Sequence, residues 1–287
     1  LVGSEMCIRV SRIDWMWANK AVFDANGISV PTTWDELNAA AEKLKAAGII
    51  PSAHGGQAWQ DATVFEAVAM GLGGNNYYKN CYVDLKESCL RSETTVKVFD
   101  QMRKLQSYTD EGSPGRDWNV ATGMVIEGKA GFQIMGDWAK GEFTAAGKTP
   151  GVDYYCAATP SNNGYLYNVD SFIFYKSSDP DKQAGQKLLA KLMMGKNFQK
   201  VFNLYKGSIP ARLDVSMDEF DKCAKTSNAD IKTAGAKGGL VPSFAHGMAQ
   251  GNTMKAALQD IITEHFNSDM SSVDAANALA DSVLANM

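Results

Sequence analysis

Aromatic and polar side chains gather at the ends of short apolar segments in this 287-residue sequence. In "AGFQIMGDWAKGEF", residues 132–135 are typical of a buried strand, which stops at Gly136 and is followed at once by Trp138. Pyranose C–H faces stack on indole rings, and sugar hydroxyl groups bind Asp, Asn, Lys and His side chains. Such residue types together predict a sugar pocket. The candidates are Trp59, Trp118, Trp138, Asp170, Lys206 and His246.

Other chemistries have less support in the sequence. It contains no G-x-S-x-G, no P-loop and no G-x-G-x-x-G after a strand, so neither a catalytic nucleophile nor a nucleotide cofactor is predicted. A glycosidase would need two carboxyl groups about 5–10 Å apart. Asp137 and Asp170 are the most suggestive pair, although such carboxylates more often tie down a loop or hold a ligand hydroxyl. A carbohydrate-active hydrolase using this pair is therefore the alternative function, and a scaffold with aromatic-rich loops is a third.

Charge and composition exclude several partners. The net charge of −4 offers no basic surface for nucleic acid or anionic lipid. No apolar run approaches the roughly 18 residues of a membrane helix. The three histidines, His54, His246 and His265, lie far apart and no C-x-x-C pair exists, so no metal site is predicted.

The first residues, "LVGSEMCIRV", contain no initiator Met, no signal peptide and no clear start of a strand or helix. We treat residues 1–11 as a non-native leader and leave Cys7 out of the cysteine count. Cys81 and Cys89 are eight residues apart around a turn, whereas Cys156 and Cys223 are distant. Spacing alone leaves both free thiols and two disulfides open.

Helical and extended patterns alternate along the chain. Thr33 and Glu36 form a capping box at the start of a helix that ends at Gly48. Further helices are predicted within residues 63–74 and 92–107, from Pro180 onward, and through most of the C-terminal third. Short strands lie between them, notably in "DYYCAATP" and "GYLYNVDSFIFY". This alternation indicates an α/β protein, and the length indicates two lobes.

Five separated motifs carry a resemblance to a known family. They are "RIDWMWANKAVFDANGISVPTTWDELNAAAEKLKAAGI", "MVIEGKAGFQIMGDWAKGEF", "NVDSFIF", "FNLYKGSIPAR" and "GGLVPSFAHGMA". In this order they resemble the bacterial extracellular solute-binding proteins of sugar ABC importers, and they are similar to the glucose/mannose-binding subgroup. The resemblance runs from about residue 12 to the C-terminus. It implies a type II periplasmic-binding-protein fold, in which two α/β lobes clamp a sugar between them.

The resemblance also implies roles for single residues. Trp118 and Trp138 would sandwich or edge a monosaccharide (glucose, or mannose or galactose), and Asp170, Lys206 and His246 would bind its hydroxyl groups. Trp59 and Gln57 would assist, and a Cys156–Cys223 disulfide is implied, whereas Cys81 and Cys89 match no family feature. The family's proteins are non-catalytic, without metal or cofactor. By this resemblance the protein would be a periplasmic monomer, secreted by a signal peptide absent from this chain, that delivers sugar to permease subunits in the inner membrane.

Members of the family run longer at the N-terminus, so the resemblance implies that most of the first lobe is missing. We expect residues 12–165 to form the first part of the second lobe, residues 166–223 a remnant of the first lobe, and residues 224–287 the closing helices of the second. The remnant should expose an apolar patch. Its expected members are Val169, Phe172, Phe174, Leu188, Leu189 and Leu192.

Overall fold

Two four-stranded sheets organise the protein, whose computed structural model describes residues 5–160 and 164–287. The body sheet has the order β3-β4-β2-β5, with β2 antiparallel to both neighbours and β3 parallel to β4. The arm sheet has the order β7-β1-β6-β8, with β1 antiparallel to its neighbours and β6 parallel to β8. The body-sheet strands are β2 (Trp15–Asn19), β3 (Ile50–Ser52), β4 (Ala130–Ile134) and β5 (Tyr154–Ala158). The arm-sheet strands are β1 (Glu5–Arg12), β6 (Tyr165–Ile173), β7 (Ile209–Pro210) and β8 (Leu240–Pro242).

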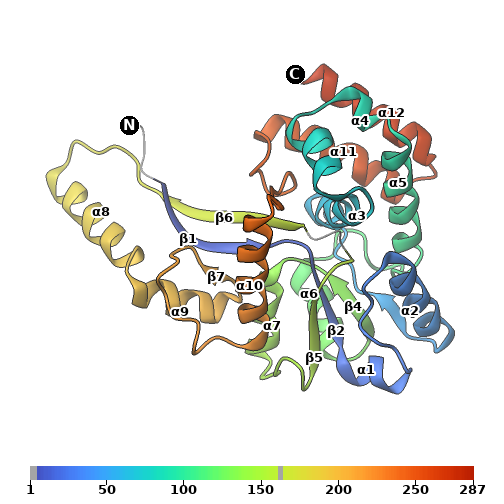
Figure 1. The fold of residues 1–287 in the computed structure, drawn as a ribbon, viewed down its shortest axis with the longest axis horizontal. Coiled ribbons are helices and arrows are strands. Elements are labelled where there is room, and N and C mark those ends of the chain that lie inside the picture. The colour runs from blue at the N-terminus through green and yellow to red at the C-terminus, as the bar shows by residue number, and fades with distance from the viewer. Residues whose placement is uncertain (1–4, 161–163) are drawn as a thin grey trace.

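Helices cover the body sheet and flank the arm sheet (Figure 1). Those of the first half are α1 (Lys20–Ala25), α2 (Trp34–Ala46), α3 (Ala58–Tyr78), η1 (Lys79–Val83), α4 (Glu87–Leu90), α5 (Glu93–Gln106), α6 (Trp118–Ile126), η2 (Asp137–Ala139) and α7 (Lys140–Ala145). Those of the second half are α8 (Pro180–Met193), α9 (Lys196–Lys206), α10 (Lys222–Ala236), α11 (Asn252–Asn267) and α12 (Ser272–Ala285).

Local sequence signals explain several of these boundaries. The predicted capping box forms at the start of α2, where the Glu36 backbone N–H donates to the Thr33 hydroxyl and the Glu36 carboxylate accepts from the Thr33 N–H. Pro180 occupies the first turn of α8, where its missing N–H costs no helical hydrogen bond. Helix α3 is longer than its pattern predicts at both ends: it begins at Ala58 and continues past Gly74, whose φ of 72° kinks it.

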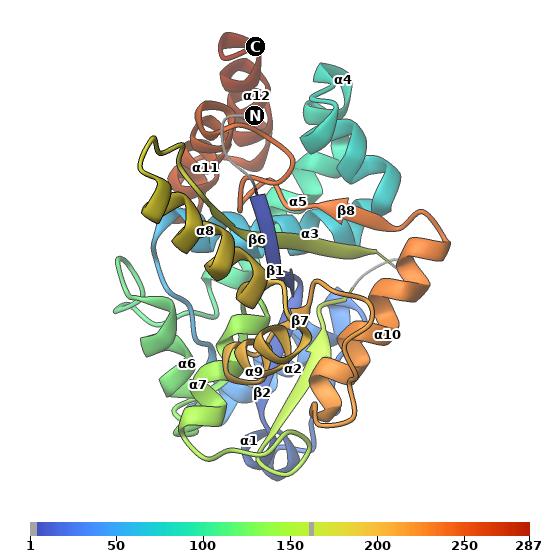
Figure 2. The same cartoon turned by 90° about the vertical axis from the view of Figure 1, so that its left-hand side faces the viewer.

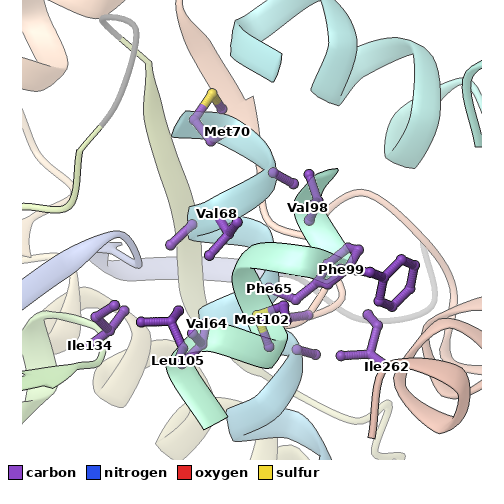
Figure 3. Packing of buried hydrophobic residues seen from close by; sticks show 14 of the residues in the cluster. Val64, Phe65, Val68, Met70, Val98, Phe99, Met102, Leu105, Ile134 and Ile262 are labelled. Carbon is purple, nitrogen blue, oxygen red and sulfur yellow. The ribbon is translucent and has the colours of Figure 1, made fainter. Parts of the chain in front are cut away.

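The main hydrophobic core lies where α3 meets α5, α11 and α12. Figure 3 shows Phe65 of α3 facing Phe99 of α5, with Met102 and Ile262 beside them. The Phe65 and Phe99 rings are 5.0 Å apart between centroids, and both side chains are fully buried. This close packing makes α3 a rigid support for the side chains on its opposite face.

Only Ile13 and Asp14 separate β1 of the arm sheet from β2 of the body sheet. Arg12, just before them, is buried and pairs with Asp14 and with Asp230 of α10. Its guanidinium lies 4.8 and 5.1 Å from the ring centroids of Tyr165 and Trp15. The crossing between the sheets is therefore held by a buried cation that is paired with two carboxylates.

Both disulfides that the cysteine count allows are present. Cys156 of β5 bonds Cys223 of α10, as the resemblance implied, and so ties the body sheet to the helix beside the arm sheet. Cys81 bonds Cys89 across the turn between η1 and α4, which settles a pairing that spacing left open. Cys7 is free and exposed.

The arm sheet includes residues that the sequence placed elsewhere. Residues 5–11, treated as a leader with no start of a strand, belong to β1 and pair with β6. β8, which lies in the range expected to hold only closing helices, also pairs with β6. Residues 6–11 do alternate, with Met6, Ile8 and Val10 between Cys7, Arg9 and Ser11, so β1 has a strand signal in its sequence, whereas the three residues of β8 are too few to show a period.

The outer face of the arm, which consists of the arm sheet with α8 and α9, is uncovered. Most of the predicted apolar patch is exposed there, as expected. Helix α8 projects away from the rest of the molecule in Figure 1 and lies toward the viewer in Figure 2. Phe172, Leu188, Leu189 and Leu192 are exposed, whereas Val169 and Phe174 are half-buried. Phe174 instead packs in a small cluster with Ile8 and Met193. Across the described ranges, no helix combines the length and apolar character needed to cross a bilayer.

Candidate functional site

A cavity of about 490 Å³ lies between the two sheets and collects most of the predicted site residues. The body side supplies aromatic rings from α3, α6 and η2, and the arm side supplies polar groups from β1, β6 and α9. His246, in the loop after β8, lies with them. The lining residues are Arg9, Trp59, Trp118, Trp138, Gly141, Glu142, Asn168, Asp170, Tyr205, Lys206 and His246.

Three of the rings form one cluster in the cavity wall. The Trp138 ring lies 5.1 Å from His246 and 6.4 Å from Trp59, and Trp59 lies 5.9 Å from His246, all between centroids. Each of these side chains is only half-buried. They therefore present apolar ring surface to the cavity while their edges support one another.

Gly136 allows Trp138 to lie in this position. A Cβ atom at Gly136 would come within 2.2–2.7 Å of three carbons of the Trp138 ring. The φ of −59° at Gly136 is open to any residue, so contact and not backbone conformation requires glycine here. At the end of β4, the Trp138 ring thus occupies the space that a side chain at position 136 would need.

The ring of His246 is held in one protonation state. The Thr63 hydroxyl donates to the Trp59 carbonyl at 2.8 Å, so its oxygen is left to accept from His246 Nε2 at 3.0 Å. Burial lowers the pKa of His246 to about 4, so the imidazole is neutral at pH 7. Its Nδ1 is then a hydrogen-bond acceptor, which suits a hydroxyl donor.

The arm side of the cavity is built around Asp170. Asn168 donates to Asp170 Oδ1 at 2.8 Å, and the Arg9 guanidinium bonds Asp170 Oδ2. Arg9 also reaches the Ser208 hydroxyl. Asp170 remains about one-third exposed, so its carboxylate is oriented by two donors and still open to a ligand.

Lys206 is placed by the end of α9. Gly207 follows it with a φ of 85°, a conformation that favours glycine, and ends the helix. A Cβ atom at Gly207 would lie 2.6 Å from the Asp137 carbonyl oxygen. This close contact brings the end of α9 against η2, so that Lys206 and Trp138 line the same cavity.

Gln57 takes a different place from the other predicted residues. It does not line the cavity; its amide oxygen accepts from Trp59 Nε1 at 2.8 Å, and its amide nitrogen donates to Asp117 at 2.6 Å. Asp117 is the residue before Trp118. Gln57 therefore holds the Trp59 side chain and, through Asp117, the start of the helix that carries Trp118.

Asp137, the other carboxylate of the hydrolase alternative, is only 3% exposed and does not line the cavity. Its oxygens accept from the Arg12 backbone N–H and the Ser208 hydroxyl, both at 2.9 Å. Burial raises the pKa of Asp137 to about 6, against the opposing effect of these hydrogen bonds. Its contacts are those of a carboxylate that ties η2 to β1 and β7.

Sequence reasoning missed Arg9, Asn168, Glu142 and Tyr205 in the cavity wall. Arg9 lies in the segment treated as a leader, although the alternation of Ile8 and Val10 with Arg9 and Ser11 is a strand signal that could have placed it on a polar face. Asn168 lies two residues before Asp170 on one strand, and the period of a strand places both side chains on the same face. That spacing could have identified it.

A second cavity of about 680 Å³ adjoins the first and shares Arg9, Asn168, Asp170, Lys206 and His246 with it. Its remaining wall includes the apolar side chains Ile8, Phe172, Phe202 and Met248. Among the described residues, no group of three or more His, Cys, Asp or Glu side chains is placed to hold a metal ion.

The two-sheet α/β fold with a cavity between the sheets is the architecture of a solute-binding protein. A family model described as "Bacterial extracellular solute-binding protein" matches residues 10–193. The chain belongs to this family, as its motifs suggested.

Four of the matched relatives carry the name "Probable sugar-binding periplasmic protein". The one from Brucella suis biovar 1 (strain 1330) is 47% identical over 277 residues, which cover 96% of this chain and 65% of the relative. The one from Rhizobium meliloti (strain 1021) is 45% identical over 277 residues, which cover 96% of this chain and 66% of the relative. The chain thus spans a little less than two thirds of the length of these relatives.

Solved structures share the fold at low sequence identity. The solute receptor AcbH, described as having an exclusive substrate preference for β-D-galactopyranose, has a TM-score of 0.81 at 19% identity, covering 98% of this chain and 72% of its own. Maltose-bound MalE3 of T. maritima has a TM-score of 0.77 at 18% identity, covering 99% and 72%. The predicted α/β fold of the type II class is confirmed.

Proposed function

We propose that this protein is the sugar-binding component of an ABC importer and that the cavity between its sheets receives a monosaccharide. The observation that carries the proposal is the ring cluster of Trp59, Trp138 and His246 facing the oriented carboxylate of Asp170 across one cavity. Such a cavity offers apolar ring faces on one side and charged hydrogen-bonding groups on the other. Pyranoses need both.

Each group has a chemical role in this proposal. Trp138 and Trp118 pack against the C–H faces of the pyranose, and burying these faces supplies the apolar part of the affinity. Asp170 accepts hydrogen bonds from sugar hydroxyl groups, Lys206 donates to them, and the neutral His246 accepts through Nδ1. Gln57 acts through Trp59 without touching the sugar.

The same proposal makes the protein non-catalytic. A hydrolase would need one carboxyl group as an acid and a second one facing the bond to be cleaved. Asp137 is buried away from the cavity and both of its oxygens are occupied, so the pair with Asp170 lacks that arrangement. The relatives are named as binding proteins, which supports this side of the proposal.

We further place the protein in the periplasm, where it delivers sugar to permease subunits of the inner membrane as a monomer. Two disulfides suit an oxidising compartment, and the relatives' name supports the location. Glucose, mannose and galactose are the candidate ligands. The lobe boundaries proposed from the sequence, at residues 165 and 223, belong to this proposal as well.

Saturation-transfer NMR with glucose, mannose, galactose and maltose tests the proposal, because it detects binding from micromolar to millimolar affinity. We expect transfer to at least one monosaccharide and recovery of every sugar unchanged. Release of aryl alcohol from an aryl glycoside, abolished by Asp170→Asn, would favour the hydrolase. No transfer to any of the four sugars would contradict the proposed cavity.

A further inference from the structure

A buried carboxylate lies behind His246. Glu66 of α3 is completely buried in the described structure, in contact with the loop that follows β8. Its Oε1 accepts from the Ser243 hydroxyl at 2.6 Å. Its Oε2 accepts from the backbone N–H groups of Phe244 and Ala245, at 3.1 and 3.3 Å, and from the Tyr78 hydroxyl at 2.8 Å. Four donors converge on one side chain.

The loop residues reach His246 through the same network. Because the Ser243 hydroxyl donates to Glu66, its oxygen is left to accept from the His246 backbone N–H, which it does at 3.1 Å. The Phe244 N–H also bonds the Tyr78 oxygen at 3.1 Å. The Ser243 and Tyr78 hydroxyl groups therefore donate as they do because position 66 supplies an acceptor.

Helix α3 contacts the ring of His246 as well as the loop that carries its backbone. Trp59, Thr63 and Glu66 are spaced by four and three residues, so they share one face of the helix. Trp59 contacts the His246 ring, Thr63 bonds its Nε2, and Glu66 holds the loop that carries its backbone. Three contacts from one rigid helix fix both the backbone and the ring.

We propose that Glu66 is a positioning residue for ligand binding: it fixes the loop that carries His246, so that the ring meets Thr63, which sets the tautomer. The part that concerns ligand binding rests on the proposed function, whereas the part that concerns the imidazole does not. Glutamine at this position would have the same size but only one acceptor oxygen and two N–H donors. The four donors of the site could then not all be satisfied, so Ser243 and the loop would have to rearrange.

Long-range ¹H–¹⁵N NMR spectra test the proposal, because the protein has only three histidines, His54, His246 and His265. In the unaltered protein at pH 8, where Glu66 is a carboxylate because burial raises its pKa only to about 7, we expect His246 to be neutral with its proton on Nε2. In Glu66→Gln we expect a mixture of tautomers at the same pH, because the rearranged loop no longer holds the ring against Thr63. Unchanged His246 signals in a folded Glu66→Gln protein would overturn the proposal.

Asp61→Asn is the matched control. Asp61 is a second fully buried carboxylate of α3, but it bonds His54 at 2.7 Å and Thr263 at 2.9 Å, away from the loop. We expect this variant to change the His54 signals and to leave those of His246 in place. Equal changes of His246 in both variants would mean that any lost carboxylate on α3 has this effect, which would also overturn the proposal.

Ser243→Ala covers the case in which Glu66→Gln does not fold. It keeps the carboxylate and removes the acceptor of the His246 N–H, so a smaller shift of His246 in the same direction is expected, and no shift would contradict the proposal. Glucose binding is measured in parallel, and we expect it to weaken about tenfold in Glu66→Gln. If the unaltered protein binds no sugar while its histidine signals respond as described, the proposed function fails and the positioning role stands.

Discussion

Trp138 presents its ring to the cavity because Gly136 leaves room for it and His246 supports its edge. A tryptophan at the end of a strand could equally have been part of the core. It is only half-buried and lines the cavity, whereas Trp15 and Trp17 of β2 are at most 1% exposed. The difference in exposure separates a ring available to a ligand from one that holds the fold.

We expect Trp138→Ala to weaken monosaccharide binding by roughly 1–3 kcal/mol, the size of one lost aromatic contact in a desolvated site. The fold should persist, because Trp138 is not among the fully buried side chains. Titration calorimetry or ligand-observed NMR measures the change, and circular dichroism checks the fold. Tyr175→Ala is the control, since Tyr175 is 77% exposed and lines neither cavity. Loss of cooperative unfolding in Trp138→Ala would show that Trp138 stabilises the core and would contradict its assignment to ligand binding.

At the scale of elements, the two disulfides close chain segments of different length. Cys156 and Cys223 are 67 residues apart, whereas Cys81 and Cys89 are 8 apart. In the chain-entropy account, the longer closure contributes about 4 kcal/mol and the shorter about 2.5 kcal/mol. The longer one also joins β5 to the start of α10, beside the Lys140–Asp221 ion pair of 2.8 Å.

We therefore expect the double variant Cys156→Ala/Cys223→Ala to lose more stability than Cys81→Ala/Cys89→Ala, both in protein made under oxidising conditions. Denaturant unfolding without reductant measures the two free energies. Intact-mass analysis of the unaltered protein serves as the control, with four fewer hydrogens expected than in the fully reduced chain. Equal losses in the two variants would mean that packing around the sulfur atoms, and not chain closure, decides their contribution.

Elements with local signals could be predicted from the sequence, and elements that depend on distant partners could not. Helix α2 carries its own capping box, and the strand ending before Trp138 shows as an apolar stretch between glycines. The sequence of β1 alternates apolar Ile8 and Val10 with polar Arg9 and Ser11, which favours a strand, but its partner β6 lies about 160 residues away, so the sheet that it joins could not be predicted locally. Arg9 of the site was missed because this segment was interpreted as a leader.

At the scale of the molecule, two buried ionisable groups make the stability of the fold depend on pH in opposite directions. Burial raises the pKa of Glu66 from 4.5 to about 7, so its contribution to stability is present below pH 4.5 and is lost as the pH rises toward 7. Burial lowers the pKa of His265 from 6.5 to about 4, so its contribution is present above pH 6.5 and is lost as the pH falls toward 4. Both nitrogens of His265 are buried without a partner in the described residues.

We expect the stability of the unaltered protein relative to Glu66→Gln to fall between pH 4.5 and 7, by up to roughly 1.4 kcal/mol per pH unit. Relative to His265→Leu, it should instead rise between pH 4 and 6.5. Urea unfolding across this range measures both differences. Lys97→Gln, on the exposed side of α5, is a control that should show no such slope. Slopes of the same sign in the two buried-site variants would contradict this account.

Ile13 and Asp14 join the two parts of the chain that form opposite walls of the cavity. On one side of them the body carries Trp59, Trp118 and Trp138; on the other the arm carries Arg9 and Asp170. The backbone at Ile13 and Asp14 thus helps to set the separation between the carboxylate and the indoles, and the Arg12 guanidinium, over the Trp15 and Tyr165 rings, holds the link in place. The width of the cavity therefore depends in part on two residues that do not line it.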